Sequence, residues 1–419
     1  AKAQTEVMVA YDQDFIYFGI ICWDPMPGKR PVESYRRDWN FMKNDNFFVT
    51  MDTYNDQTNG FAFGVNAAGG QWEGMQADGG KVAGEWDGKW YSAVQGYDDR
   101  WVAEFKIPFR TIRFNEGDME WGINFSRLDL KTDEKSAWAP VPRQFASATL
   151  AYTGSLEWET PLPRAGVRFS LIPYVSGQAT RDKEAGDPTQ YKGRAGMDAK
   201  VILSTSMNLD LTINPDYSQV EVDQQVTNLD RFEIFFPEKR KFFLENSDLF
   251  ANLGTETLRP FFSRRIGLDQ PVIAGARLSG NAGENWRIGL MDMQTAATDE
   301  HSADNFAVAV LQRKVLARSN VGAFLTNKQV ITNPGDSVAL YDFNRVAGGE
   351  FNFASADNNW TGKVFYHHSF NPGDEGNRFA TAAMISYDTE QFKAGWNQAY
   401  VGANYLAEMG YVRRNAYHQ

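Results

Sequence analysis

Hydrophobic and polar residues alternate along most of this chain, in short segments separated by clusters of Gly, Asn and Asp. Alternation with a period of two predicts β-strands, because successive side chains of a strand point to opposite faces. Over residues 1–158 the spacing of these segments is typical of a β-sandwich. The predicted strands are Thr5–Tyr11, Asp14–Trp23, Asn46–Asp52, Gly60–Val65, Trp90–Gln95, Trp101–Ile107 and Trp121–Leu128.

A second alternating region follows the segment Glu159–Pro163, whose two prolines interrupt any strand ladder. We therefore predict a linker over residues 159–165 and a second domain over residues 166–419. Its strands carry charged residues on one face and apolar residues on the other, and short turns alternate with longer polar connections. The predicted strands are Gly166–Gly177, Met197–Leu203, Met207–Asn214, Val272–Ser279, Trp286–Gln294, Phe306–Arg313, Asn320–Lys328, Gly348–Ala354, Trp360–Phe370, Arg378–Asp388 and Phe392–Tyr405.

Strands of about ten residues with one apolar face are the signature of a transmembrane β-barrel. Trp286, Trp360, Phe392 and Trp396 lie near predicted strand ends, where barrels carry aromatic girdles. A barrel in lipid has to close, and the final segment Gly410–Gln419 has no terminal aromatic residue, so we expect a barrel cut at both ends. The predicted fold class is all-β: an N-terminal β-sandwich followed by an antiparallel transmembrane β-barrel that is incomplete in this chain.

The alternation stops between residues 214 and 271, within the second domain. A connection of that length between neighbouring strands is either folded on itself or functional, so we predict a plug or long loop with a hairpin-like fold. Its Phe residues are expected to pack against the barrel or the sandwich, and its charged segment to pair with Asp198 and Asp210. The candidate plug residues are Asp216, Glu221, Asp223, Glu238, Lys239, Arg240, Lys241, Phe242 and Phe243.

The overall charge excludes one class of partner. The net charge is -11 and the pI is near 5.0, whereas nucleic-acid-binding proteins need a basic surface to displace counterions.

Cys22 is the only cysteine, so no disulfide forms within the chain, and its apolar neighbours predict a buried thiol. No run of about 18 apolar residues predicts a transmembrane helix.

Most of the tryptophans fall in the first domain. A Trp at an alternating strand position usually belongs to the core, whereas an exposed indole beside Arg, Asp or Asn can stack on a sugar ring. Trp39 and Trp72 lie in predicted loops, the latter in the glycine-rich segment Ala67–Gly84, which we predict to be a flexible surface loop. The candidate ligand-binding residues are Arg37, Trp39, Trp72, Trp86, Trp138 and Arg127.

The sequence contains no recognisable catalytic constellation, and we expect a protein that is not an enzyme. The adjacent residues His367 and His368 point to opposite faces of a strand and so cannot chelate one metal ion. No cofactor is predicted, except that two acidic segments have the oxygen ligands that suit Ca²⁺. Solvated turns explain both segments more simply; their residues are Asp52, Asn55 and Asp56 in one, and Asp216, Glu221 and Asp223 in the other.

One set of motifs lies in the first domain: Thr5-Glu6-Val7 with Tyr11-Asp12, Arg37-Asp38, Asp45 with Phe48 and Asp52, Ala103-Glu104 with Ile107-Pro108-Phe109, and Trp121-Gly122-Ile123-Asn124 with Arg127. With these motifs the first domain resembles carbohydrate-binding family 9 sandwiches. The central connection, with Phe261-Phe262-Ser263-Arg264-Arg265-Ile266-Gly267, resembles outer-membrane proteins with domain of unknown function 5916. The resemblance covers essentially the whole chain; it implies a Gram-negative outer-membrane location and, for the sandwich, sugar binding by stacked tryptophans, but it implies no particular activity.

The leading functional hypothesis is a barrel in outer-membrane lipid whose sandwich binds a glycan or polysaccharide, with transport as a further role. One alternative is a structural or secretion-associated barrel whose sandwich docks a protein partner. Another is a haem-binding redox module, for which the candidate axial ligands are Met8, Met42, Met51 and Met75.

Overall fold

The structure is a computed structural model that describes residues 2–77, 79–115, 117–162, 168–181, 188–217, 227–229, 231–283, 285–331, 343–373 and 376–418. The chain forms two compact units. One comprises Ala1–Ala165, Ser355–Asn359 and Tyr387–Ala394, and the other Gly166–Ala354, Trp360–Ser386 and Gly395–Gln419. The prediction of an all-β fold built from antiparallel sheets is confirmed. Within the described residues, no helix has the length and apolar character needed to cross a membrane.

The first unit contains two antiparallel sheets with a shared core. The 4-stranded sheet has the order β1 (Thr5–Tyr11), β2 (Phe15–Trp23), β8 (Arg100–Pro108) and β7 (Tyr91–Gly96). The 7-stranded sheet has the order β10-β9-β3-β4-β5-β6, with β11 also paired to β9. Its strands are β3 (Asn46–Asp52), β4 (Gly60–Asn66), β5 (Gln71–Ala77), β6 (Lys81–Ala83), β9 (Glu120–Asp129), β10 (Glu134–Ala137) and β11 (Gly154–Glu157).

Alternating apolar side chains from both sheets meet in the core of this unit. The ring centroid of Phe105 on β8 lies 6.1 Å from that of Phe47 on β3 and 5.0 Å from that of Trp90. Edge-to-face contacts of this kind stabilise a core beyond the apolar area that they bury. Cys22 is fully buried in the same core, as predicted, and burial raises the pKa of its thiol to about 12.

The segment Ala67–Gly84 contradicts the prediction of a flexible loop, because it forms β5 and β6. Its glycines are needed for close strand packing. A Cβ atom at Gly74 would lie 2.5 Å from the backbone oxygen of Ala83 on β6, and one at Gly70 would lie 2.9 Å from the backbone oxygen of Arg36. Glycine-rich sequence here marks crowded sheet positions.

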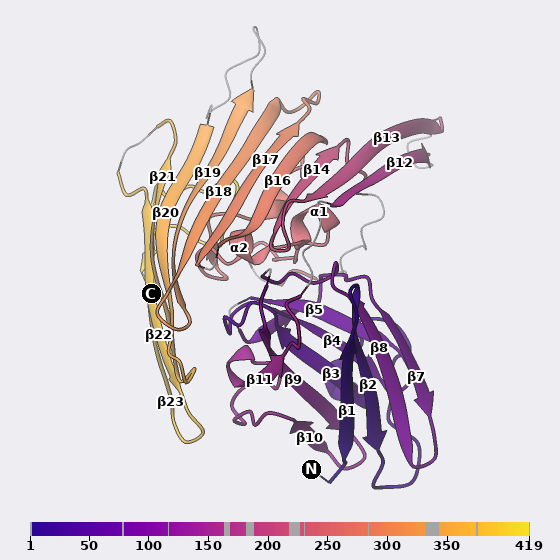
Figure 1. The fold of residues 1–419 in the computed structure, drawn as a ribbon. Helices are drawn as coiled ribbons and strands as arrows, with labels where there is room; N and C mark the ends of the chain where they lie inside the picture. The colour runs from indigo at the N-terminus through magenta and orange to yellow at the C-terminus, as the bar shows by residue number, and fades with distance from the viewer. Residues whose placement is uncertain are drawn as a thin grey trace. The chain divides into compact units, whose positions relative to one another are not determined.

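The second unit is organised around a 12-stranded antiparallel sheet, drawn as a curved sheet in Figure 1. Its order is β12-β13-β14-β16-β17-β18-β19-β20-β21-β22-β23-β25, so β12 and β25 lie at its two edges and the described strands do not close into a barrel. The strands are β12 (Arg168–Thr180), β13 (Gln190–Ile202), β14 (Met207–Ile213), β16 (Val272–Ala282), β17 (Trp286–Thr295), β18 (Ala303–Val315), β19 (Ser319–Ile331), β20 (Phe343–Ala354), β21 (Trp360–Phe370), β22 (Phe379–Asp388), β23 (Lys393–Val401) and β25 (Tyr417–His418).

The central connection between β14 and β16 packs against one face of this sheet, which we call the covered face. In its described part it forms α1 (Lys241–Leu244), α2 (Asp248–Ala251), β15 (Leu258–Arg259) and a short turn of 3-10 helix, in place of the predicted hairpin. Figure 1 shows α2 beside β17, and a Cβ atom at Gly289 of β17 would lie 2.7 Å from the Phe250 ring. The connection contributes seven buried apolar residues to the core of this unit: Phe243, Leu249, Phe250, Leu253, Leu258, Phe261 and Ile266.

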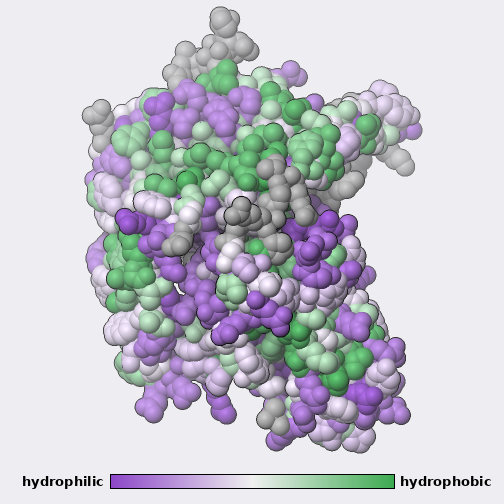
Figure 2. All heavy atoms as spheres, viewed as in Figure 1, coloured by the Kyte–Doolittle hydropathy of each residue, from purple (hydrophilic) through white to green (hydrophobic). Residues whose placement is uncertain are grey.

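The opposite face of the sheet, which we call the open face, exposes apolar side chains, whereas the covered face buries both polar and apolar ones. At the polar positions the polarity is the reverse of that in a soluble protein. Many buried side chains of the covered face are polar, including Asn208, Asp210, Thr212, Arg277, Ser279, Asp304, Thr326, Asn344, Glu350, His367 and Ser369. The exposed side chains of the open face are largely apolar, including Leu211, Leu290, Leu311, Val321, Leu325, Val364, Tyr366, Phe370 and Ile385. Figure 2 shows hydrophobic residues gathered in a band across part of this sheet.

Candidate functional site

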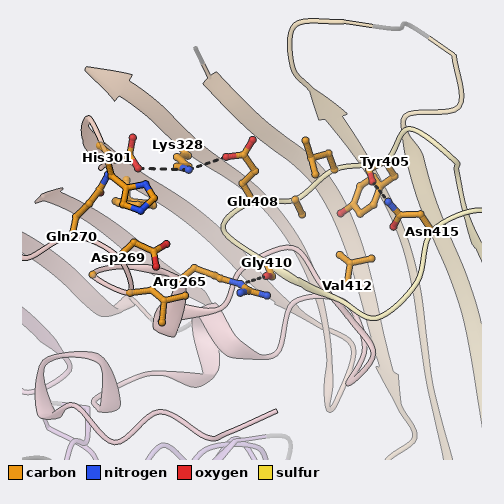
Figure 3. A pocket seen from close by; sticks show the side chains of 16 residues that line it. Arg265, Asp269, Gln270, His301, Lys328, Tyr405, Glu408, Gly410, Val412 and Asn415 are labelled. Atoms are coloured by element: carbon orange, nitrogen blue, oxygen red, sulfur yellow. Dashed lines mark hydrogen bonds and ion pairs between the residues drawn. The ribbon is translucent and has the colours of Figure 1, made fainter. Parts of the chain in front are cut away.

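A polar pocket of about 380 Å³ lies in the second unit, on the covered face of the sheet. Three parts of the chain form it: residues 265–270 of the central connection, the ends of β18 and β19, and residues 405–415 after β23. The charged and hydrogen-bonding side chains that line it are Arg265, Asp269, Gln270, His301, Asp304, Lys328, Tyr405, Glu408 and Asn415, most of which are labelled in Figure 3.

Lys328 of β19 lies between two carboxylates of this pocket. Its Nζ atom is 2.9 Å from Oε2 of Glu408 and 3.6 Å from Oδ2 of Asp304 (Figure 3). On the opposite side, Arg265 donates from Nε to the backbone oxygen of Gly410 at 3.0 Å, and its Nη2 pairs with Glu233 at 2.6 Å. The pocket therefore offers cations, carboxylates and amides to a small polar molecule.

Tyr405 contributes a hydroxyl group that is fully buried and has no hydrogen-bond partner among the described residues. Burial raises the pKa of this hydroxyl, and the negative charge of Glu350 raises it further, so the group remains protonated at neutral pH. A buried hydroxyl without a partner costs free energy. A bound water or polar ligand would supply the missing hydrogen bond.

Polar contacts attach the connection to strands across the sheet. The side chain of Glu245 pairs with Lys200 of β13 and accepts a hydrogen bond from Asn208 of β14. Asp248 lies 2.6 Å from Arg287 of β17. The last of these contacts joins the backbone nitrogen of Gly254 to the carboxylate of Glu350 on β20 at 2.6 Å. The same carboxylate is 3.0 Å from Nζ of Lys363 and 2.9 Å from Nε2 of His367.

The expected pairing of the basic segment with Asp198 and Asp210 is wrong for Arg240. Arg240 instead makes a two-point ion pair with Glu238, at 2.9 and 2.7 Å, and donates to the backbone oxygens of Ser263 and Ile266. A partner two residues away needs little ordering of the chain, and two parallel hydrogen bonds make a strong contact. Burial disfavours the Glu238 carboxylate, but Arg240 and Ser263 outweigh it and lower the pKa of Glu238.

The two aspartates have partners outside the basic segment. Asp210 pairs with Arg277 at 3.0 Å and with Lys200 at 3.6 Å, while Asp198 accepts a hydrogen bond of 2.6 Å from Thr212. Arg277 is a suitable partner because it lies opposite Asp210 on the adjacent strand. This register could not be read from the sequence, since β14 and β16 are separated by the whole connection.

The remaining predicted plug residues have varied positions. Phe243 is buried, Phe242 lies beneath the guanidinium of Arg277 at 5.4 Å, Lys239 is half-buried and Lys241 begins α1. The backbone nitrogen of Asp216 donates to the hydroxyl of Tyr174 at 3.1 Å. Glu221 and Asp223 lie outside the described residues.

In the first unit the structure brings together two of the predicted ligand residues. Trp39 and Trp72 have ring centroids 6.3 Å apart, and the Trp72 ring also lies 5.8 Å from that of Phe48. Arg37 pairs with Glu73, donates to Gln71 at 3.4 Å and approaches Asp87 at 3.7 Å, and its two partners on β5, Glu73 and Gln71, point to the opposite face of the strand from Trp72. Trp39 is nearly fully buried and donates to the oxygen of Gly70, so it supports Trp72 and presents no face to a ligand.

The other three predicted ligand residues do not join this group. Trp86 packs against Phe61 and Phe63 of the core, with ring centroids 5.3 and 6.0 Å apart. Trp138 is 58% exposed and its ring lies over Gly154. Arg127 is buried and pairs with Asp129 at 2.9 Å.

Arg127 belongs to a buried charge cluster at one end of the sandwich. It lies 3.6 Å from Asp24, and it donates to the backbone oxygens of Gln4 and Trp23 at 3.0 and 2.8 Å. Nearby, burial raises the pKa of Asp45 to about 6; the hydrogen bond from the Leu130 nitrogen opposes this shift, whereas the charge of Asp129 adds to it. The cluster fastens the N-terminal strand to the sandwich.

The acidic segment considered for Ca²⁺ uses its carboxylates within a turn. Asp52 accepts hydrogen bonds from the nitrogens of Asp56 and Gln57, and Asp56 accepts from those of Thr58 and Asn59. Carboxylates engaged in this way cap a turn. Among the described residues, no group of three or more His, Cys, Asp or Glu side chains is placed to hold a metal ion.

The methionines considered as haem ligands do not converge. Met51 is fully buried in the sandwich core, while Met8 on β1 and Met42 are 58% and 66% exposed. Met75 on β5 is half-buried at the edge of the core.

The sequence interpretation missed the polar pocket entirely. Its charged residues come from segments more than a hundred residues apart, from Arg265 to Glu408, and no local motif links them. The sequence did contain a weak signal for the burial of Glu350 and His367, which lie outside this pocket. Each is a polar residue at a strand position on the same face as buried apolar residues.

The family model described as Domain of unknown function (DUF5916) matches residues 165–283, a narrower region than the sequence motifs suggested. No curated protein matches the chain. Two solved structures of a carbohydrate-binding module family 9 protein from Caldicellulosiruptor kristjanssonii, one in complex with glucose and one with cellotriose, are similar at 12% sequence identity and a TM-score of 0.28. The similarity covers 38% of this chain and 78% or 77% of those chains. The comparisons thus link residues 165–283 to DUF5916 by similarity alone.

Proposed function

We propose that this protein is a non-enzymatic binding protein of the Gram-negative outer membrane, in which the large sheet is part of a barrel and contacts lipid through its open face. The observation that carries this proposal is the reversed polarity of the sheet. Exposed Leu290, Leu311 and Leu325 lie on one face, while buried Asp210, Arg277 and Glu350 lie on the other. In water the exposed leucines would be unfavourable, whereas in lipid they need no cover.

The ends of the strands support the same proposal. Trp286 begins β17 and Trp360 begins β21, and they are 39% and 43% exposed. The guanidinium of Arg313 lies 5.2 Å from the centre of the Trp286 ring. Amphipathic rings and cations at strand ends are the groups that suit the boundary between hydrocarbon and water.

Extraction of membranes with alkaline carbonate tests this proposal. Wild-type protein expressed with its complete chain should remain in the membrane pellet and enter solution only with detergent. A peripheral membrane protein serves as the control that is released. Recovery of this protein in the carbonate supernatant, folded and without detergent, would falsify the proposal.

We further propose that the sandwich binds a glycan at Trp72, and that its activity is binding without catalysis. Trp72 offers a half-exposed ring supported from beneath by Trp39 and Phe48. Such a ring matches the apolar face of a sugar.

Titration of the detergent-solubilised protein with a panel of oligosaccharides, including cellotriose, tests the glycan site. Trp72→Ala should weaken binding strongly, while Trp138→Ala, which removes an exposed Trp outside the group, should leave it unchanged. Sensitivity to Trp138→Ala alone would assign the site to Trp138 instead. Absence of binding to every sugar would instead favour a sandwich that docks a protein partner.

A further inference from the structure

A shallow pocket of about 350 Å³ lies on the open face of the sheet, across β14, β16, β17, β18 and β19. Its floor contains Ala276, Ala307 and Ala309, whose side chains end at Cβ. Larger side chains occupy the positions beside them: Leu278 is paired with Leu290, Leu290 with Ala309, and Ala309 with Leu325. The small residues thus form an apolar hollow between leucines on neighbouring strands.

One end of this hollow is polar. Asp292, Ala307, Asn327 and Arg345 lie side by side on four successive strands, because Asp292 pairs with Ala307, Ala307 with Asn327, and Asn327 with Arg345. Asp292 and Asn327 line the pocket, and Nε of Arg345 donates to Oδ1 of Asn327 at 2.8 Å. A carboxylate and a guanidinium therefore flank one end of an otherwise apolar pocket.

We propose that this pocket binds a zwitterionic phospholipid. One acyl chain lies in the alanine-floored hollow, the phosphate contacts Arg345 and the ammonium group contacts Asp292. The inference rests on the proposed function, because lipid reaches the open face only if the sheet lies in a membrane. The proposed function requires only that the open face contacts bulk lipid. The inference adds one site on that face that binds a particular class of lipid.

The two charged residues lie in one row across the sheet, on strands three places apart. Three strand spacings of about 4.8 Å place the backbones of Asp292 and Arg345 about 14 Å apart. The bond to Asn327 turns the Arg345 side chain back across β19, which shortens the distance between the two charges. Asp292 is exposed and accepts one hydrogen bond, from Nδ2 of Asn305 at 3.1 Å. Guanidinium groups bind phosphate oxygens with favourable geometry.

Native mass spectrometry of the detergent-solubilised full chain tests the site. Delipidated protein is mixed with dioleoyl-phosphatidylethanolamine or, separately, with dioleoyl-phosphatidylglycerol. Wild-type protein should retain one phosphatidylethanolamine molecule in preference to phosphatidylglycerol. Ala307→Phe and Ala309→Phe fill the hollow and should each abolish this adduct. Ala323→Phe makes the same change on the same exposed face outside the hollow, and should preserve it.

Two headgroup variants identify the charges. Asp292→Asn should remove the preference for phosphatidylethanolamine over phosphatidylglycerol, and Arg345→Gln should weaken retention of both lipids. Equal lipid retention by wild type, Ala307→Phe and Ala309→Phe would overturn the proposal. Carbonate extraction of the same samples separates the two failures: release of the wild-type protein rejects the membrane location, whereas a membrane-embedded protein without a selective adduct rejects only the lipid site.

Discussion

The backbone nitrogen of Gly254 donates a 2.6 Å hydrogen bond to the carboxylate of Glu350, which ties the central connection to β20. The same carboxylate pairs with Lys363 and His367, and all of its partners are buried or nearly so. Removing one partner of a buried ion pair leaves the other charge without compensation. Glu350 thus joins one backbone group of the connection to two side chains of β21.

Glu350→Ala should loosen the connection and destabilise the second unit by about 3–5 kcal/mol. Glu350→Gln retains an acceptor for the Gly254 nitrogen and should cost less. Urea unfolding measures the stability, and limited proteolysis within residues 231–271 measures the loosening. Glu390→Ala, at an exposed position, is the control that should change neither. Equal protease resistance of Glu350→Ala and wild type would show that the bond does not hold the connection.

Leu325→Arg should impair folding into membranes, because an arginine facing hydrocarbon costs up to about 2–4 kcal/mol. Gln329→Arg adds the same side chain on the same strand and face, four residues closer to the strand end, where the cost falls to about 0–1 kcal/mol. Refolding into lipid vesicles, followed by the shift in gel mobility on heating, measures the folded fraction. Equal yields for the two variants would contradict a lipid-facing open face.

Cys22 should resist thiol reagents in the folded protein. Its thiol is fully buried and its pKa is raised to about 12, and the thiolate is the reactive form. We expect the reaction with a disulfide reagent at neutral pH to be at least about a thousand times slower than in the unfolded chain. Rapid labelling under native conditions would show that the sandwich opens around β2.

Asp45→Asn should change how the stability of the sandwich depends on pH. The folded pKa, about 6, lies above the ordinary value of 3.8, so the folded state binds this proton more tightly than the unfolded chain. Protonation therefore stabilises the fold, and wild type should lose roughly 2–3 kcal/mol relative to Asp45→Asn as the pH rises from about 4 to about 6. Thermal unfolding of both proteins across this range measures the difference.

Asp12 provides a control of opposite sign. Hydrogen bonds from the nitrogen of Asp14 and the hydroxyl of Tyr17 lower the pKa of Asp12. Its stabilising contribution is present at neutral pH and is lost as the pH falls. On acidification, wild type should therefore lose stability relative to Asp12→Asn. Over the same change in pH, wild type should gain stability relative to Asp45→Asn.

Local sequence determined the strands and the faces of their side chains. Alternation located β1, β3, β14 and β21 within one residue at each end, because a strand exposes opposite faces in turn whatever its neighbours are. The same rule placed His367 and His368 on opposite faces, and the structure buries the first and leaves the second partly exposed. The interpretation failed at the crowded glycine positions around β5 and in the central connection, and it shortened strands such as β13 and β20.

Tertiary structure decided which of these residues meet. Strand register decided that Asp210 pairs with Arg277, and packing within the sandwich decided that Arg127 and Trp39 are buried. The packing of the central connection created the pocket between Arg265, Lys328 and Glu408. Such contacts join residues far apart in the chain, and no local pattern encodes them. The sequence alone determined that one face of the large sheet is apolar; the packing of the connection on the other face determined that the apolar one is exposed.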